Sequence, residues 1–438
     1  MKIQEHIDKI SWTFADKGIY VLFGFFTLLF HINYLSPKDF GLFTHLNNLN
    51  IWILVISDGF ALMNIIQFGA KEINRAKVNT IALIIHVALT LSASLILFAL
   101  NEPLADIFSE PRMKEVLSYL PILVLFNIPR TYCMKFIYRD RVFKKLFFID
   151  LVLFGTMMLA TVIIIFFKGH LSFIDMVYIY FCGTFFGSVA AIILTYKNLV
   201  FSLKGDIKAI TLIKFGIPLT LYNTLHSIPR NLDYFVVQYF FSTATVGIYS
   251  SAKQLFRFFE EAMIAANSMV YPVAVDQLNR NDKKGLNDLM TKSISFMFFI
   301  FLALILFFEL GFAKIVIDML LPVKYAYALG HFNILILSSI FLPFLMLGSV
   351  ITASGKPKIV LLFVAISVVV WITSFLIIGY IGNPEYISIA MLLYLLTLGL
   401  LILIYSSSKF NIKPIELFRA FKDTKNFIYS YFEKKKRK

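Results

Sequence analysis

Residues 216–262, GIPLTLYNTLHSIPRNLDYFVVQYFFSTATVGIYSSAKQLFRFFEEA, decide the fold, because ionisable side chains interrupt runs of aromatic and aliphatic residues there. Arg230 and Asp233 stand in such a run, just after Pro229. Moving one such charge into lipid costs about 2.5–3.5 kcal/mol on insertion scales. Whether that cost applies depends on the solvent around the chain, which the rest of the sequence indicates.

The composition is that of a membrane protein. Of the 438 residues, 59% are hydrophobic and 15% are charged, whereas soluble domains carry about 25% charged residues. Apolar runs of the ~20 residues that cross a bilayer as a helix recur along the chain. They are too long and too evenly apolar for the strands of about 10 residues in outer-membrane barrels. We therefore predict an all-α integral membrane fold.

Twelve transmembrane helices are predicted from these runs. Asp16 and Lys17 interrupt the first run and no small-residue cleavage site follows it, so this segment is expected to remain as a span. Cys133 and Cys182 both fall within spans and lack metal-type spacing, so we expect no disulfide, metal site or cofactor. The predicted spans are 11–34, 42–66, 79–100, 117–138, 147–167, 173–196, 211–240, 247–272, 293–310, 328–352, 359–381 and 386–405.

Lysine and arginine are divided unequally between the two sets of alternating loops. One set contains 29 of them and the other contains six. Because the basic set faces the cytoplasm, both termini are expected there, and the net charge of +15 needs no nucleic-acid partner. The basic set is 1–10, 68–78, 139–146, 197–214, 276–292, 354–358 and the tail from 406, and the other set is 35–41, 101–116, 168–172, 241–246, 311–327 and 382–385.

An internal repeat organises the spans. Residues 35–44, LSPKDFGLFT, resemble residues 241–250, FSTATVGIYS, in a short turn followed by Gly, an aliphatic, an aromatic and a hydroxyl residue. Six spans per repeat give both halves the same orientation, and this implies a pseudo-twofold axis along the membrane normal. We expect the turns 35–41 and 241–246 to approach one another when a cavity between the halves faces the cytoplasm. The predicted parts are an N-terminal six-helix bundle, 1–210, a C-terminal six-helix bundle, 211–405, and a basic cytoplasmic tail, 406–438, which either lies on the anionic inner leaflet or is disordered.

Polar side chains form stripes at helical spacing on spans one, two, seven and eight, which the repeat brings together. Such stripes are costly against lipid, so they are expected to line a watery cavity. The alternative is that Arg230 with Asp233, and Arg257 with Glu260 or Glu261, form ion pairs that pin helices to one another. The candidate substrate-binding residues are Lys17, Arg130, Arg230, Lys253, Arg257, Tyr20, Asn223 and Tyr234, and the candidate carboxylates for coupling Na⁺ or H⁺ are Asp16, Asp58, Asp233, Glu260 and Glu261.

The excess of cations in these stripes indicates an anionic ligand. The guanidinium fork suits phosphate, and the tyrosine hydroxyls suit sugars. The sequence contains no nucleotide-binding glycine loop, metal-ligand cluster or nucleophile motif that would indicate an enzyme.

Residues 35–44, 216–262, MVYPVAVDQLNRND at 269–282 and ITASGKPK at 351–358 resemble the polysaccharide-transporter branch of the multidrug/oligosaccharidyl-lipid/polysaccharide (MOP) exporter superfamily, which includes O-antigen and capsule repeat-unit flippases. The resemblance implies two six-helix bundles in a V shape, as in the related MATE transporters. It also implies a bacterial inner-membrane protein whose cargo is an oligosaccharide on undecaprenyl pyrophosphate, moved to the outer leaflet. Membrane lipids, a polysaccharide polymerase and a chain-length regulator are the other partners that it implies.

Three other functions stay open at this point. A MATE-type drug/cation antiporter is expected to have a carboxylate-rich cavity, and a lipid II flippase is expected to have two further C-terminal spans. A scaffold for a membrane polysaccharide assembly complex would transport nothing.

Overall fold

The computed structural model describes residues 3–410 and residue 412. Every regular element in this part of the chain is helical, as the sequence predicts. Most of the predicted cytoplasmic tail, 413–438, lies outside the described residues.

Six predicted spans precede residue 200, and each is found as a helix. Two of them contain a π-helical segment: η1, Thr27–Ile32, extends the first helix, and η2, Asp58–Leu62, interrupts the second. A short helix, α5 (Asn101–Ile107), follows the third span. The spans are α1 (Ile3–Phe26) with η1, α2 (Pro37–Ser57) with η2 and α3 (Met63–Gln67), α4 (Glu72–Ala99), α6 (Met113–Asp140), α7 (Phe143–Lys168) and α8 (Phe173–Thr195).

The remaining six predicted spans are helical as well. The seventh is broken by the π-helical segment η4, Ile228–Leu232, which begins at the Ile228–Pro229 pair. The spans are α9 (Ala209–Ser227) with η4 and α10 (Asp233–Phe240), α11 (Thr243–Asn279), α12 (Lys283–Phe307) with η5 (Phe308–Phe312) and α13 (Ala313–Leu320), α14 (Ala328–Ser338) with η7 (Ser339–Phe344) and α15 (Leu345–Ala353), α16 (Pro357–Ile381), and α17 (Ile387–Phe410).

Ten helical stretches of the described chain are long and apolar enough to cross a membrane. The two predicted spans that are not among these ten are 211–240 and 247–272, although both are helical. Their polar residues are the reason: α11, for example, carries Lys253, Glu260 and Glu261 along its length. Helices this polar avoid lipid only by facing protein or a water-filled space.

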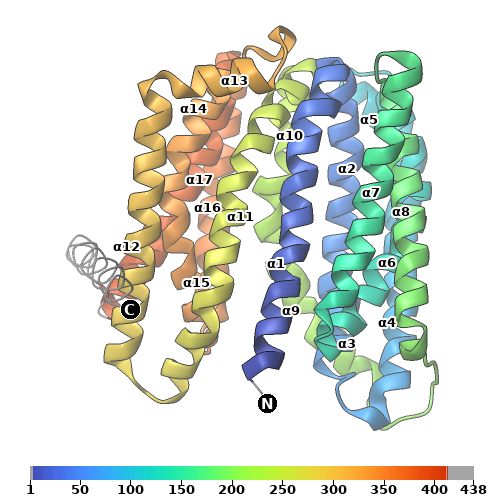
Figure 1. The fold of residues 1–438 in the computed structure, drawn as a ribbon, viewed down its shortest axis with the longest axis vertical. Coiled ribbons are helices and arrows are strands. Elements are labelled where there is room, and N and C mark those ends of the chain that lie inside the picture. The colour runs from blue at the N-terminus through green and yellow to red at the C-terminus, as the bar shows by residue number, and fades with distance from the viewer. Residues whose placement is uncertain (1–2, 411, 413–438) are drawn as a thin grey trace, which may run out of the picture. The chain divides into compact units, whose positions relative to one another are not determined.

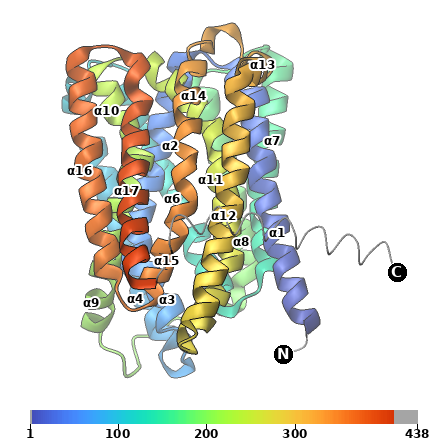
Figure 2. The ribbon, with the colours of Figure 1, turned by 90° about the vertical axis from the view of Figure 1, so that its left-hand side faces the viewer.

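The helices group into two compact units. The first contains Met1–Ser250 and Leu320–Tyr325, and the second contains Ser251–Met319 and Ala326–Lys438. In the first unit α8 packs against both α6 and α7, and α1 packs against α7 (Figure 1). In the second unit α17 packs against α14 and α16 (Figure 2). The contacts thus group α9, η4, α10 and the start of α11 with the N-terminal helices, and the predicted division at residue 210 stays a prediction.

Candidate functional site

A cavity of about 510 Å³ lies within the first unit. Its walls come from α1, the α2–η2 region, α6, α9 and η4. An aliphatic wall on α2 faces polar walls on the other helices. The lining residues are Tyr20, Ile51, Leu54, Val55, Asp58, Leu62, Arg130, Thr131, Met134, Lys135, Tyr138, Asn223, His226, Ser227, Arg230 and Asn231.

Two glycines allow the α9 and η2 walls of the cavity to pack closely against each other. A Cβ added at Gly216 of α9 would lie 2.3 Å from the carbonyl oxygen of Phe60 in η2. A Cβ added at Gly59 of η2 would lie 2.8 Å from the Cα of Thr220. No side chain fits at either place, so the backbones of α9 and η2 are in contact. Both cavity-lining π-helical segments, η2 and η4, carry a charged residue of the site, and π-helical turns often occur at functional sites.

Arg130 of α6 is a buried cation of the cavity, and its side chain is 12% exposed. It donates to Oδ1 of Asp150 at 2.5 Å and reaches the hydroxyl of Tyr20 at 3.5 Å. Asp150 lies on α7 and is fully buried. Asp16 of α1 is also buried and interacts with both Asp150 and Arg130. Two carboxylates therefore lie close to one guanidinium behind the cavity wall.

A second ion pair lies on the cavity surface itself. Nζ of Lys135 lies 2.5 Å from Oδ1 of Asp58, and both residues line the cavity. Asp58 is the first residue of η2, and Lys135 lies about one and a half turns of α6 beyond Arg130. Arg130 and Lys135 thus form ion pairs between helices, and both also face the cavity.

Arg230 lies within the π-helical segment η4, and Asp233 is the first residue after it. Arg230 lines the cavity, whereas Asp233 is fully buried and accepts a hydrogen bond from Tyr249 at 2.8 Å. Tyr234 is buried beside Tyr249, with ring centroids 5.8 Å apart. Because η4 has wider turns than an α-helix, the stripe expected at 100° per residue ends at Asn231. The two charges that interrupt the apolar run thus lie in different surroundings.

The structure brings together part of the predicted set. Tyr20, Asp58, Arg130, Asn223 and Arg230 line the cavity. Lys17 lies over the Tyr20 ring, with its Nζ 5.0 Å from the centroid. Asp16 is buried behind the wall, and Asp233 and Tyr234 are buried away from it. The remaining predicted residues lie on α11 in the second unit and are not among the lining residues; they are Lys253, Arg257, Glu260 and Glu261.

Sequence reasoning missed Asp150, the partner of Arg130. Its signal is present, because Asp150 is the one acidic residue in FKKLFFIDLVLFGTMM, the first part of α7. An acidic residue in a span implies a basic partner on a neighbouring helix. Among the lining residues Arg130, Lys135 and Arg230 are basic and Asp58 is acidic, so the cavity surface suits an anion. In the described part of the chain no group of His, Cys, Asp or Glu gathers as a metal site.

A tight contact joins the two repeated turns, 35–44 and 241–250, which we call the turn pair. A Cβ added at Gly41 would lie 2.0 Å from the carbonyl oxygen of Thr243, and a Cβ added at Gly247 would lie 1.9 Å from that of Pro37. The two contacts are equivalent under the 206-residue repeat, which relates Pro37 to Thr243 and Gly41 to Gly247. A reciprocal contact of this kind is the signature of a local twofold axis.

Two equivalent residues of the repeat meet close to this axis. The hydroxyl of Thr44 donates to that of Ser250 at 3.0 Å, and both side chains are buried. The turns meet, as the repeat predicts. Gly41 and Asp58 lie on one continuous helical run, so the turn pair is about 25 Å along that run from the charged part of the cavity.

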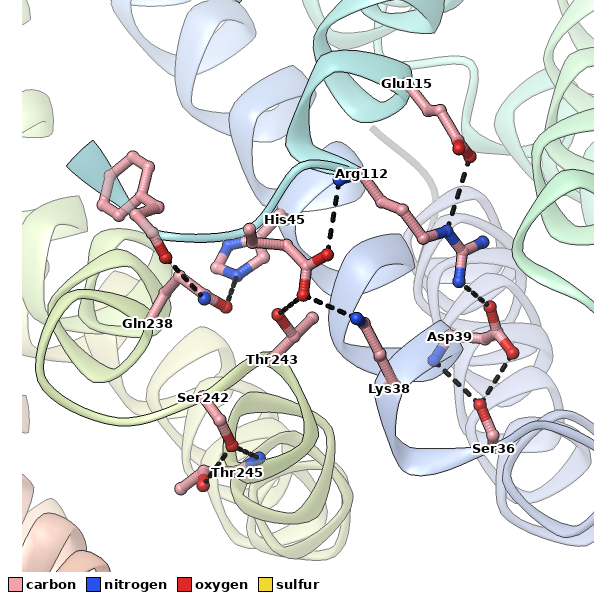
Figure 3. A network of polar contacts seen from close by, with 12 residues as sticks. Ser36, Lys38, Asp39, His45, Arg112, Glu115, Gln238, Ser242, Thr243 and Thr245 are labelled. Carbon is pink, nitrogen blue, oxygen red and sulfur yellow. Dashed lines mark hydrogen bonds and ion pairs between the residues drawn. The ribbon is translucent and has the colours of Figure 1, made fainter. Parts of the chain in front are cut away.

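A polar network surrounds the turn pair (Figure 3). Glu110, in the loop before α6, accepts from Lys38 at 3.0 Å and from Thr243 at 2.7 Å. Arg112 of the same loop pairs with Asp39 at 2.8 Å. Burial by itself raises the pKa of Glu110, but hydrogen bonds from Thr243, Lys38 and the Arg112 backbone outweigh it and hold the pKa below the ordinary glutamate value.

Loops that the Lys/Arg count assigns to one side of the membrane meet around the turn pair. Besides the 101–116 loop, the segment Leu320–Tyr325 contacts it, because the hydroxyl of Tyr325 donates to the carbonyl of Leu35 at 3.4 Å. The 168–172 loop lies next to the first turn, because Leu171 N donates to the carbonyl of Tyr34 at 3.0 Å. The structure thus agrees with the predicted grouping of these loops.

Solved structures with this fold are transporters. A multidrug resistance MATE family transporter of the MOP superfamily, in an inward-facing conformation, is 13% identical with a TM-score of 0.73, over 92% of this chain and 94% of its own. The lipid II flippase MurJ, in an inward closed conformation, is 13% identical with a TM-score of 0.74, over 91% of this chain and 87% of its own. A MOP superfamily transporter from Pyrococcus furiosus, described by the reverse polarity of its binding pocket, is 14% identical with a TM-score of 0.65. The match covers 92% of this chain and 94% of its own.

The fold of this chain is therefore that of the MOP superfamily, in which two six-helix bundles carry twelve transmembrane helices. No curated protein sequence matches it. The family model described as polysaccharide biosynthesis protein matches residues 34–329. That match covers more than half of the chain, so this multi-pass membrane protein belongs to the polysaccharide biosynthesis protein family.

Proposed function

We propose that the protein is a flippase for lipid-linked oligosaccharides. Its cargo is a repeat unit on undecaprenyl pyrophosphate, carried from the cytoplasmic to the outer leaflet of the bacterial inner membrane for O-antigen, capsule or exopolysaccharide assembly. Membership of the polysaccharide biosynthesis protein family and the fold of MOP transporters support this function. Both termini face the cytoplasm in this proposal, and a polysaccharide polymerase and a chain-length regulator act on the delivered cargo.

The observation that carries the proposal is the cavity of about 510 Å³ with basic side chains on two walls. Arg130 and Lys135 stand on α6, and Arg230 stands on η4. Guanidinium groups form bidentate hydrogen bonds to phosphate. Asn223, Thr131 and Asn231 offer amide and hydroxyl groups that suit a sugar, and the aliphatic wall of α2 suits an apolar part of the cargo.

Transport in this proposal works by alternating access of the two halves, 1–210 and 211–405. The turn pair is the outer gate, and its closed form is the one described above. Two carboxylates close to Arg130, Asp16 and Asp150, are the strongest candidates for coupling Na⁺ or H⁺, since two neighbouring carboxylates can hold a proton or a cation between them. The other candidates stay Asp58, Asp233, Glu260 and Glu261.

Two rival cargoes predict different cavities. A cationic drug favours carboxylates, whereas the lining residues of this cavity are net basic. Lipid II carries a pyrophosphate too, so the cavity charge does not separate it from other lipid-linked sugars, and the family match favours polysaccharide precursors. A scaffold for polysaccharide assembly needs no such cavity.

The test is a flipping assay with a fluorescent undecaprenyl-pyrophosphate oligosaccharide in proteoliposomes. Arg230→Ala is expected to reduce the flipping rate at least about tenfold, the scale of one charge-assisted contact. Arg230→Lys should retain part of the rate, because charge survives without the fork. Lys214→Ala is the matched control, since Lys214 is an exposed residue of α9 outside the cavity. Folded wild-type protein that leaves the labelled lipid in its original leaflet would refute the proposal.

A further inference from the structure

The two halves of the turn pair are alike in backbone and different in charge. Ser36 caps α2 by accepting from Asp39 N at 3.0 Å, and Ser242 accepts from Thr245 N at 3.2 Å at the equivalent place. The first turn carries Lys38 and Asp39 where the second carries Ala244 and Thr245. The electrostatic part of the closure therefore comes from one side of the local twofold axis.

Glu110 joins the two unlike turns. Its side chain is 7% exposed, and Oε2 accepts from both Lys38 of the first turn and Thr243 of the second. The same carboxylate accepts from Arg112 N through Oε1 at 3.3 Å. A buried carboxylate held by several donors resists losing any of them.

The contacts of the Glu110 loop, residues 108–112, are unequal on the two sides. Toward the first turn the loop has two ion pairs, Arg112 with Asp39 and Glu110 with Lys38. Toward the second half it has neutral donors only: Thr243 on Glu110, and Gln238, which donates to the carbonyl of Phe108 at 3.2 Å. Figure 3 shows Gln238 and Thr243 approaching from one side and Lys38 and Asp39 from the other.

We propose that Glu110 is an asymmetric latch on the turn pair, which stays with the first turn and releases at Thr243 and Gln238 when the gate opens. This inference rests on the proposed function only in naming the turn pair a gate. Two ion pairs hold the loop to the first turn, whereas one hydroxyl donor and one amide donor hold it to the second half, so the contacts to the second half break first. Once they break, the reciprocal backbone contact at Gly41 and Gly247 is the remaining barrier to opening.

The test measures opening directly and uses no cargo. A reporter cysteine replaces Ser250, which is 8% exposed beneath the turn pair, in a chain carrying Cys133→Ser and Cys182→Ser. The rate of its modification by a polar maleimide is measured on purified protein in nanodiscs. Glu110→Gln and Thr243→Val are each expected to raise this rate about tenfold, the scale of one charge-assisted hydrogen bond. Size-exclusion profiles check that each variant is folded.

Glu115→Gln is the matched control. Glu115 is a neighbouring carboxylate that pairs with Arg112 of the same loop region at 3.6 Å. Its substitution should leave the rate unchanged. Unchanged rates in both Glu110→Gln and Thr243→Val would overturn the latch, and a change in Glu110→Gln alone would overturn Thr243 as a release point. Because the assay contains no lipid-linked sugar, a wrong cargo leaves its result unaffected.

Discussion

The turn pair and the cavity lie in the same unit and use charge in opposite ways. At the turn pair no space is left between the backbones, and Lys38, Asp39, Glu110 and Arg112 pair with each other around the contact. In the cavity, Arg130, Lys135 and Arg230 border about 510 Å³ of space. Charges around a tight backbone contact hold segments together, whereas charges that border an open space can also receive a ligand.

The ion pairs of the two regions also differ in how deeply they are buried. Lys38 is 49% exposed beside Glu110, so water weakens that ion pair. Arg130 is 12% exposed beside a fully buried Asp150, so water screens that ion pair little. Loss of a partner is therefore expected to matter most in the cavity wall and least at the turn pair.

The largest expected effect is on Arg130. Arg130→Leu leaves Asp150 as a buried charge with its guanidinium partner removed, which costs about 3–5 kcal/mol of stability. The measurement is the amount of monodisperse protein that remains after heating. The double variant Arg130→Leu, Asp150→Leu should recover part of the stability, because an apolar pair can replace a buried ion pair, although Asp16 stays buried without the guanidinium. It should not recover flipping if Arg130 also binds phosphate.

A matched pair separates burial from charge in this test. Lys114 and Glu102 form an ion pair at 3.1 Å whose side chains are 46% and 75% exposed. Lys114→Leu is expected to leave heat stability unchanged, as exposed pairs contribute little. Equal losses for Arg130→Leu and Lys114→Leu would break the proposed contrast between buried and exposed charge.

A smaller effect is expected from adding a methyl group at the turn pair. Gly41→Ala and Gly247→Ala place a Cβ against a backbone carbonyl, and overpacking of this kind typically costs about 1–3 kcal/mol. The reporter cysteine at Ser250 should then react about fivefold to about a hundredfold faster. Gly155→Ala, with nothing within 4 Å of the added Cβ, is the control and should behave as wild type.

The two substitutions also sharpen the twofold interpretation. The distances, 2.0 Å at Gly41 and 1.9 Å at Gly247, are nearly the same, so the two variants should raise the rate by similar factors. A large rise in one variant and none in the other would mean that the turns do not share a local twofold axis.

The sequence predicted the helices better than the positions of their side chains. Each of the twelve predicted spans is helical, and ten of them are apolar enough to cross a bilayer, whereas 211–240 and 247–272 are more polar. The repeat placed Gly41 and Gly247 in equivalent turns, and these turns do meet. The regular spacing of an α-helix did not predict the side-chain positions after η2 and η4, because a π-helical segment shifts every later side chain around the helix axis.

Gln238 and Glu110 illustrate what was beyond sequence reasoning. At α-helical spacing Gln238 continues the stripe of Arg230, yet it bonds to Phe108 and His45 near the turn pair. Glu110 lies in a loop outside the spans and has no pattern that marks it. Its importance arises from the packing of segments far apart in the sequence, which no local pattern records.

The smallest expected effect is the pH dependence of the latch. Donors from Thr243, Lys38 and Arg112 hold the pKa of Glu110 below its ordinary value. A depressed carboxyl pKa stabilises the closed form fully above the pKa of the released group, about 4.3. That stabilisation is lost as pH falls through the lower pKa of the held group. The latch should therefore stay closed throughout the neutral range.

The ratio of labelling rates between Glu110→Gln and the parent measures this dependence, since the chemistry of the reporter thiol cancels in it. The ratio should hold near its neutral value of about ten down to about pH 4.3 and approach one below it. Lys38, Arg112, Asp39, Glu115 and His45 also border Glu110, but they are present in both proteins and largely cancel as well. A ratio that falls between pH 8 and pH 6 would contradict the assignment, because no carboxylate with a depressed pKa titrates there. The contrast with the cavity would then need another titrating group at the turn pair.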